Sequence, residues 1–464
     1  MKKKLLLINP VARYIKRKSI FFKNYIDAPF QPLNLAIIAA LTPDDWEIEI
    51  FDEIFEPFSY READLVGVTA CTSSANRVYK IAEGYRDRGV PTVMGGVHAS
   101  MLPDEALRFV STVVIGEAEG IWEQVIKDFE TDNLQKVYQG SYLPMNKAPQ
   151  PRRDLFNSKY IVGTIQTSRG CPHDCDFCSV TALNGRKYRK RPVEEVLDEL
   201  ETVPQKKIFF FDDNLFGKGK EDRERTISLF KGMARRGLNK QWACQASLNE
   251  VDDEELLYYA SKAGCTMIIL GVESEKEDSL AGLGKKNNFR KLARYNEVFK
   301  LINKFKISVY GTFMFGMDSD RIDDLHNRVH FINKSRVDVM HPSILTPYPG
   351  TKTYEKLNKN GRLLYTNYPK DWDYYDMSEI LYKPTQMTED EFRKAMIQCW
   401  VKLHNWRNIF YKFLKSLLYT KSQAAAVVSL LSNMVYRYIT FSKIKEWKRQ
   451  NNFQMKDELQ KNKK

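Results

Sequence analysis

The chain has 464 residues, of which 43% are hydrophobic and 28% are charged, so we expect two or three globular domains and exclude a disordered chain. The formal net charge of +13 favours anionic partners such as phosphates, nucleic acid or an acidic membrane face, without choosing among them. Seven cysteines, three of them within eight residues, exclude a disulfide scaffold and indicate a reducing cytosol and a metal site.

Residues 1–135 alternate short apolar runs with helical stretches. We predict strands at 4–8, 46–51, 64–69, 90–94 and 112–115, and helices at 32–41 and 74–88. This alternation is typical of a doubly wound α/β domain, which binds ligands beyond the carboxyl ends of its strands. The apolar run after Met1 is too short for a signal peptide, and we predict no membrane-spanning helix.

Residues 136–158 are irregular and rich in proline, and we interpret them as a linker. A second α/β series follows over residues 159–365. Its predicted strands are 161–167, 207–212, 242–246, 267–272, 308–315 and 342–346, with helices at 193–202, 220–236, 253–263 and 289–304. Six such units predict a partial (β/α)6 barrel. Residues 366–464 carry no strand pattern and are expected to be mostly helical.

Three cysteines, Cys171, Cys175 and Cys178, form a CxxxCxxC motif directly after the first barrel strand. Thiolates suit iron–sulfur iron or zinc. Zinc normally takes four protein ligands, whereas three thiolates on a cubane leave one iron open to a substrate-like ligand. The carboxyl end of a barrel strand is also where such barrels carry their chemistry. A structural zinc knuckle and three buried cysteines remain the alternatives.

This motif, with the aromatic Phe177 before its last cysteine, resembles the radical S-adenosylmethionine superfamily, and the resemblance extends over about residues 160–350. It implies that the three cysteines bind a 4Fe–4S cluster. The open iron would be chelated by the amine and carboxylate of S-adenosylmethionine. One electron would then split the carbon–sulfur bond and yield a 5′-deoxyadenosyl radical that abstracts hydrogen.

The resemblance also implies cofactor contacts at the barrel strand ends. In that family a Gly-Gly-Glu type motif follows the second strand, where this chain has the acidic pair before Asn214. The implied contact residues are Phe177, Asp213, Gln245, Ser247, Glu273 and Ser274, together with the segments 311–316 and 346–351. Taken alone, Asp213 or Glu273 would be interpreted as a helix cap. Cys244 and Cys265 are expected to be core residues.

The first domain resembles the cobalamin-binding domain of one large subgroup of that superfamily. Asn9-Pro10, the helix at 32–41 and the runs 95–107 and 115–120 carry this resemblance in order. The implied contacts are Thr69, Ser73, Gly95, Gly96, Gly116 and Glu117, of which Thr69 and Ser73 could equally be caps. The loop near Asp52 lacks the DxHxxG histidine, so cobalt would have no such ligand, and His98 is interpreted as a hydrogen-bonding histidine. A response-regulator-like or purely structural domain is the alternative.

The resemblance implies a cobalamin-dependent radical enzyme, most commonly a methyltransferase that acts on an unactivated carbon of a small-molecule or lipid-like substrate. A flavodoxin or ferredoxin would be its electron donor. One alternative is a cyclising or rearranging enzyme without methyl transfer. Another is an RNA-modifying methylthiotransferase, which normally has a second cysteine cluster where this chain has only Cys71. The non-enzymatic alternative is a metal-binding scaffold or regulator.

Residues 407–449 contain nine Lys or Arg and one acid, Glu446, interleaved with aromatic and aliphatic residues. Such a segment can lie on an anionic membrane. Equally, it can be a helical lid on the barrel with a solvated basic face. Nucleic acid is a third and weaker alternative, because no RNA-binding module is recognisable. We therefore expect a cytoplasmic protein, with peripheral contact to the inner face of a membrane left open.

Overall fold

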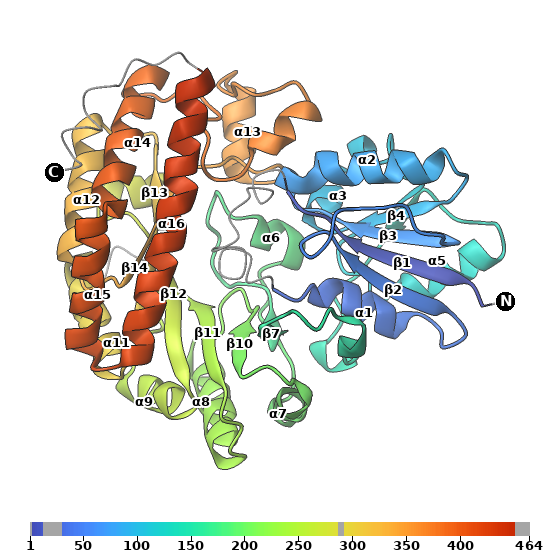
Figure 1. The fold of residues 1–464 in the computed structure, drawn as a ribbon, viewed down its shortest axis with the longest axis horizontal. Coiled ribbons are helices and arrows are strands. Elements are labelled where there is room, and N and C mark those ends of the chain that lie inside the picture. Colours follow the sequence, from blue (N-terminus) through green and yellow to red (C-terminus); the bar gives the residue numbers. More distant parts are fainter. Residues whose placement is uncertain (1, 13–29, 286–291, 451–464) are drawn as a thin grey trace.

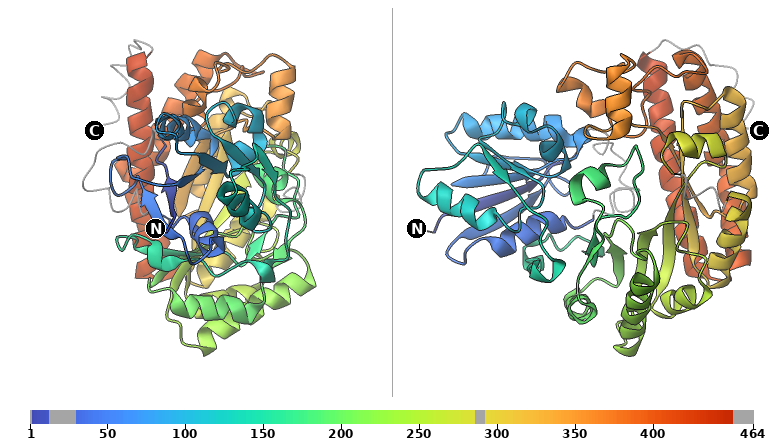
Figure 2. Two further views of the ribbon diagram at one scale, coloured as in Figure 1. Left: turned by 90° about the vertical axis from the view of Figure 1, so that its right-hand side faces the viewer. Right: turned by 180° about the vertical axis from the view of Figure 1, so that it is seen from behind.

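The computed structural model describes residues 2–12, 30–285 and 292–450. Figure 1 shows two parallel sheets side by side, with long helices from the end of the chain against the second sheet. The view from behind in Figure 2 shows the first sheet and its helices as a layer apart from the second. The predicted fold class, an α/β domain followed by a partial barrel and a helical region, is confirmed.

The first sheet is parallel throughout, in the order β2-β1-β3-β4-β5-β6. Its strands are β1 (Lys4–Asn9), β2 (Glu47–Asp52), β3 (Leu65–Thr69), β4 (Thr92–Gly95), β5 (Thr112–Ile115) and β6 (Val137–Gln139). The helices are α1 (Leu33–Leu41), α2 (Ala75–Arg86), α3 (Val97–Met101), α4 (Pro103–Ala106) and α5 (Trp122–Glu130). The strand order reverses at β1, which creates a switch point between β1 and β3.

The run of leucines in β1 has no alternation because both of its faces are buried. Leu6 and Ile8 pack into one hydrophobic core and Leu5 and Leu7 into another, as expected for a parallel strand between helices. β6 lies inside the predicted linker, and the sequence did not reveal it. Its three residues are too few to form a recognisable pattern, and only pairing with β5 defines it.

The second sheet has the order β14-β13-β12-β11-β10-β7, also parallel, and therefore forms an open barrel. Its strands are β7 (Val162–Ile165), β10 (Lys207–Phe210), β11 (Gln241–Ala246), β12 (Cys265–Glu273), β13 (Ser308–Phe315) and β14 (Val339–Ile344). The helices around it are α6 (Ser179–Asn184), α7 (Val193–Thr202), α8 (Lys220–Arg235), α9 (Glu254–Lys262), α10 (Glu277–Gly282), α11 (Tyr295–Lys304), α12 (Ile322–Lys334) and α13 (Lys352–Lys359). A short antiparallel pair, β8 (Ser168–Arg169) with β9 (Arg189–Lys190), flanks the cysteine motif.

Two predicted elements differ from the observed ones by three residues or more at their start. The last strand was expected at 342–346 but occupies Val339–Ile344, because it pairs with β13 from Val339 onward and tolerates Pro342 within it. The helix predicted at 289–304 begins at Tyr295, and part of its expected start lies outside the described residues.

The C-terminal region consists of α14 (Glu389–His404), α15 (Trp406–Thr420) and α16 (Gln423–Gln450), preceded by a 3-10 turn at Lys370–Tyr374. α16 covers the free edge of the barrel. Asn433 donates from Nδ2 to the Asp338 carbonyl (2.8 Å) and accepts from the Met340 amide (3.0 Å), so it pairs backbone groups that an edge strand would leave open.

The sequence predicted no helix able to cross a membrane. Among the described residues, Gln423–Arg449 is long and apolar enough to do so, judged by length and composition alone. This helix nevertheless buries Asn433, and Lys443 pairs with the buried Glu379 at 3.0 Å. In this structure it therefore packs as part of the globular fold.

Candidate functional site

A cavity of about 530 Å³ lies between the two sheets. Its first wall consists of residues at the carboxyl ends of β1, β3, β4 and β5 and of residues from α1. The opposite wall comes from the barrel and includes Gln166, Arg169, Leu183, Asn184 and Phe211. The volume suits an organic ligand of substantial size, and the position is the switch point at which doubly wound sheets bind ligands.

Five of the six contact residues predicted for the first domain line this cavity: Thr69, Gly95, Gly96, Gly116 and Glu117. Gly96 has a φ of +93°, and a Cβ there would lie 2.7 Å from Thr69 Oγ1 and 3.0 Å from the Ala70 carbonyl oxygen. Only glycine therefore allows the chain to turn so close to β3. Ser73 is buried and is not among the lining residues; its hydroxyl lies 3.6 Å from Cys71 Sγ.

His98 is completely buried beside the cavity wall but does not line it. Its Nε2 lies 2.9 Å from the Tyr79 hydroxyl and 3.3 Å from Glu105 Oε1, and Trp372 also donates to that carboxylate oxygen. This geometry agrees with the interpretation of His98 as a hydrogen-bonding residue.

The cysteine motif forms a loop between β8 and α6, at the mouth of the barrel. All three thiols are free and partly buried, and burial raises the pKa of Cys171 to about 11 and that of Cys178 to about 12. The loop is anchored through Asp176, whose amide donates to the Leu283 carbonyl (3.0 Å) and whose carbonyl accepts from the Thr353 amide (2.9 Å). Phe177 packs against the core that the first domain shares with the barrel.

In the described part of the chain, no three His, Cys, Asp or Glu side chains are grouped so as to hold a single metal ion. The three thiols are nevertheless close enough that the charge of Cys171 and Cys175 raises the pKa of Cys178 further. A cubane binds each thiolate to a different iron, so its ligands lie farther apart than those of a single ion. Three thiols on one loop in a CxxxCxxC motif fit a cluster.

Asp213 connects the second barrel strand to the cysteine loop. Its Oδ2 accepts from the Gly170 amide (3.1 Å) and from Asn184 Nδ2 (3.0 Å), and burial raises its pKa. Gly170 has a φ of +88°, and a Cβ there would lie 2.4 Å from the Lys187 carbonyl oxygen. Because Asn184 also lines the cavity, Asp213 lies between the cavity and the start of the cysteine motif.

Gln245, Ser247 and Glu273 end neighbouring strands, as predicted. The Gln245 side chain is exposed, whereas the Ser247 amide donates to Asn214 (3.1 Å). Glu273 has a φ of +62°, and its carboxylate is paired with Lys285 Nζ at 2.8 Å. Although burial opposes its charge, Lys285 has a raised pKa because of Glu273 and the nearby thiols.

Lys285 was missed by the sequence reasoning, although its Nζ lies 6.0 Å from the centre of the Phe177 ring. In the sequence, Lys285 is marked only by the two glycines before it and by its place twelve residues after Glu273. This pattern is too common to interpret. Gly271 makes room for the pair, since a Cβ there would lie 2.7 Å from Lys285 Nζ.

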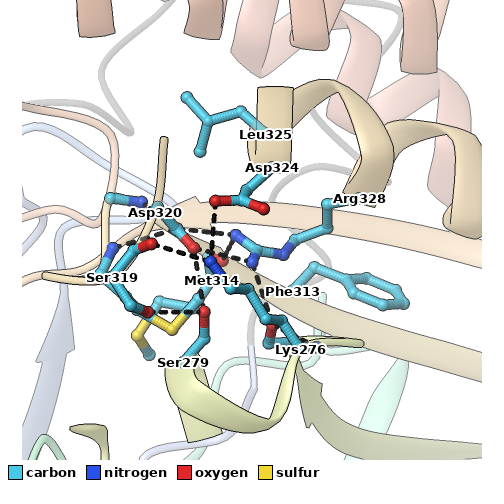
Figure 3. A network of polar contacts seen from close by, with 12 residues as sticks. Lys276, Ser279, Phe313, Met314, Ser319, Asp320, Asp324, Leu325 and Arg328 are labelled. Atoms are coloured by element: carbon cyan, nitrogen blue, oxygen red, sulfur yellow. Dashed lines mark hydrogen bonds and ion pairs between the residues drawn. The ribbon is translucent and has the colours of Figure 1, made fainter. Parts of the chain in front are cut away.

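Ser274 contacts Arg328, one of the residues in the polar network of Figure 3. The Ser274 hydroxyl accepts from Arg328 Nη2 (2.9 Å), and Arg328 is fully buried against Asp320 (2.8 Å). The same Asp320 accepts from the amides of Gly316 and Met317. The network therefore fixes the turn after β13, within the predicted 311–316 segment, and engages the hydroxyl of Ser274.

Buried ion pairs join the two domains beside the cavity. Arg169, two residues before Cys171, pairs with Glu119 (2.5 Å) and Glu117 (3.4 Å), and Arg189 donates to Glu117 (2.8 Å). These pairs tie the loop after β5 to the strands on either side of the cysteine motif. Breaking a buried pair typically costs about 3–5 kcal/mol, so the two halves of the site are firmly positioned.

Two known families match separate parts of the chain. The Radical SAM superfamily matches residues 165–332, which include the cysteine loop and the barrel strands as far as α12. The B12 binding domain matches residues 24–126, which include most of the first sheet. The two matched regions thus lie on opposite sides of the cavity.

Similar proteins match most of the chain. The bacteriochlorophyllide d C-12(1)-methyltransferase of Chlorobaculum tepidum is 30% identical over 383 residues, covering 79% of this chain and 81% of that protein. The hopanoid C-2 methylase of Rhodopseudomonas palustris is 27% identical, covering 76% and 70%. The structure of TsrM, a radical S-adenosylmethionine methyltransferase from Kitasatospora setae, superposes with a TM-score of 0.69 at 16% identity over 95% of this chain and all of that one.

Proposed function

Because this chain belongs to the family of radical S-adenosylmethionine enzymes with a cobalamin-binding domain, we propose that it transfers a methyl group from S-adenosylmethionine to an unactivated carbon of a small-molecule or lipid-like substrate. The observation that carries this proposal is that one and the same cavity is lined both by the glycine turns of the first sheet and by barrel residues next to the cysteine loop. The bacteriochlorophyllide d C-12(1)-methyltransferase and the hopanoid C-2 methylase among its relatives suggest a substrate of the bacteriochlorophyllide or hopanoid kind.

In this proposal the chain uses a 4Fe–4S cluster, S-adenosylmethionine and cobalamin. When bound, the cluster supplies the electron that cleaves S-adenosylmethionine, and cobalamin carries the methyl group. Cys171, Cys175 and Cys178 would hold the cluster. Gly95, Gly96 and Gly116 would let cobalamin approach the backbone, and Thr69 would offer it a hydroxyl. The buried ion pairs of Glu117 would keep the two cofactors at a fixed separation.

Around the cluster, Asp213 and Glu273 would orient S-adenosylmethionine, with Phe177, Gln245 and Ser247 completing its site. Lys285 sits between Glu273 and the thiols, where a cation suits a carboxylate of the ligand. The enzyme would work in the cytoplasm with a donor such as flavodoxin or ferredoxin, and with peripheral membrane contact through its C-terminal helices.

Glu273→Gln should raise the dissociation constant for S-adenosylmethionine by about 10–100-fold, since it removes one charge-assisted hydrogen bond and leaves Lys285 without its carboxylate partner. Calorimetric titration of the reconstituted protein measures the constant, and the iron content should not change. Glu277→Gln, which alters an exposed carboxylate four residues away, is the matched control. Unchanged affinity with a lower melting temperature would instead make Glu273 a structural residue.

Bound cobalamin should have no nitrogen ligand from the protein, because the first domain lacks the DxHxxG histidine and His98 is held by Tyr79 and Glu105. Electron paramagnetic resonance of the cob(II)alamin form reports an axial nitrogen as a triplet splitting. A triplet that His98→Ala removes would refute this prediction and make His98 the ligand.

The proposed reaction is tested by incubating the reconstituted protein without oxygen, with a reductant, a lipid extract and S-adenosylmethionine deuterated in its methyl group. Mass spectrometry should detect a product that carries the labelled methyl group. An unlabelled product with rearranged bonds would favour the cyclising or rearranging alternative.

A further inference from the structure

The helix α15 is oriented with its polar side inward. A surface helix normally turns its apolar face to the core. Here Ile409 is the one apolar residue among the four buried residues of α15, and the other three are polar, with exposed fractions of 1% for Lys412, 0% for Ser416 and 1% for Thr420. On the other side, Phe410 is 58% exposed, Leu414 40% and Leu418 70%. The spacing of four residues places these three side chains in one stripe along the helix.

Specific hydrogen bonds hold the helix in this orientation. Lys412 Nζ donates to the carbonyls of Ile332 (2.7 Å) and Val337 (2.8 Å), at the end of α12 and beyond it. The neighbouring Lys415 donates to the Lys334 carbonyl (3.0 Å). Turning the helix to bury its leucines would break these hydrogen bonds, at a cost for each bond. The apolar side is therefore kept outward by the packing of α15 itself.

The stripe belongs to a larger exposed patch. Of the fifteen large hydrophobic side chains that are exposed in the described part of the chain, seven lie on α15 and the first turns of α16. They are Trp406, Phe410, Tyr411, Leu414, Leu418, Tyr419 and Val427. Exposed apolar side chains gathered on one segment in this number mark a site of interaction. We call these seven residues the α15 patch, and α15 itself lies on the side of the barrel away from the first sheet (Figure 1).

Every charged residue in the chain segment that carries the α15 patch is basic. Residues 406–445 contain no Asp or Glu, whereas Arg407 is exposed on α15 and Lys421 is exposed directly after it. Cations also contact the aromatic rings at its edge, with Lys415 over Tyr411 and Arg336 over Tyr419. Aromatic and aliphatic side chains with a basic rim complement an anionic lipid surface. A second copy of the chain would instead bring two basic helices together.

We propose that the α15 patch docks this protein on an anionic lipid bilayer, with Phe410, Leu414 and Leu418 entering the interface. This inference rests on the peripheral contact in the proposed function and names the surface that makes it. The patch is remote from the cavity, so docking and catalysis should be separable by substitution.

The test uses the full-length reconstituted protein and sedimentation with vesicles of phosphatidylglycerol and phosphatidylcholine. Wild type should bind the anionic vesicles at low salt and be released at high salt, as the Debye length shrinks. The triple variant Phe410→Gln/Leu414→Gln/Leu418→Gln keeps the helical propensity and should bind at least about 100-fold more weakly. A control variant, Ile161→Gln/Tyr258→Gln/Met377→Gln, changes three exposed apolar residues elsewhere and should bind as wild type does.

Equal vesicle binding by both triple variants, or none by wild type, would overturn the proposal. Light scattering could instead find a dimer that the Gln substitutions on α15 convert to a monomer. If that dimer also does not bind vesicles, the patch is an interface with a second copy of the chain. Cleavage of S-adenosylmethionine by the α15 variant should equal that of wild type. Failure of cleavage in wild type would contradict the proposed function and leave the docking result to be judged by itself.

Discussion

Replacing Cys171, Cys175 or Cys178 by alanine should each abolish the reductive cleavage of S-adenosylmethionine, with 5′-deoxyadenosine falling below detection. Each cysteine supplies one of only three thiolates, so its loss frees a second iron and loosens the cubane. The iron content of the reconstituted protein should fall in parallel. Chromatography of the reaction mixture measures the nucleoside, and a colorimetric assay measures the iron.

Cys244 and Cys265 provide matched controls. Both are fully or almost fully buried in the barrel core, and the pKa of each thiol is raised by that burial. Cys244→Ala and Cys265→Ala should lose some stability from the small cavity left behind and retain iron and cleavage. Loss of iron from Cys244→Ala would mean that the cluster ligands have been wrongly assigned.

Gly96→Ala should weaken cobalamin binding by about 100-fold or more. The added Cβ would lie 2.7 Å from Thr69 Oγ1, and the alanine would have to adopt a φ of +93°, which residues other than glycine rarely allow. The turn that lines the cavity must therefore move. Absorbance of cobalamin retained on the protein after desalting measures the loss.

Gly89→Ala separates backbone strain from crowding. Gly89 has a φ of +73°, in the connection before β4, and its added Cβ would meet nothing within 4 Å. This variant should be less stable by about 1 kcal/mol and bind cobalamin normally. If Gly89→Ala lost cobalamin as completely as Gly96→Ala, the effect would come from general instability of the domain and not from the cavity.

The sequence predicts those parts of the fold that local patterns define. Continuous burial of both faces makes β1 visible as an apolar run, and the close spacing of Cys171, Cys175 and Cys178 makes the cysteine loop visible as a motif. Strand ends predict that Asp213 and Glu273 lie at the same edge of the barrel. In these cases neighbouring residues determine the structure.

Other parts of the site depend on partners far apart in the chain. The pair between Glu117 and Arg189 joins residues 72 positions apart, and the Lys285 partner of Glu273 follows an ordinary glycine loop. In α15 the sequence shows mixed basic and aromatic residues but not which side faces inward. The carbonyls beyond α12 that bind Lys412 determine that, and they are visible only in the folded protein.

The most direct test of the cluster and cobalamin acting together is an anaerobic incubation of the reconstituted wild-type protein with cobalamin, dithionite and S-adenosylmethionine labelled in its methyl group. We expect that 5′-deoxyadenosine is formed and that the label appears on the protein-bound cobalamin. Protein that holds iron and cobalamin but yields neither the nucleoside nor labelled cobalamin would contradict it.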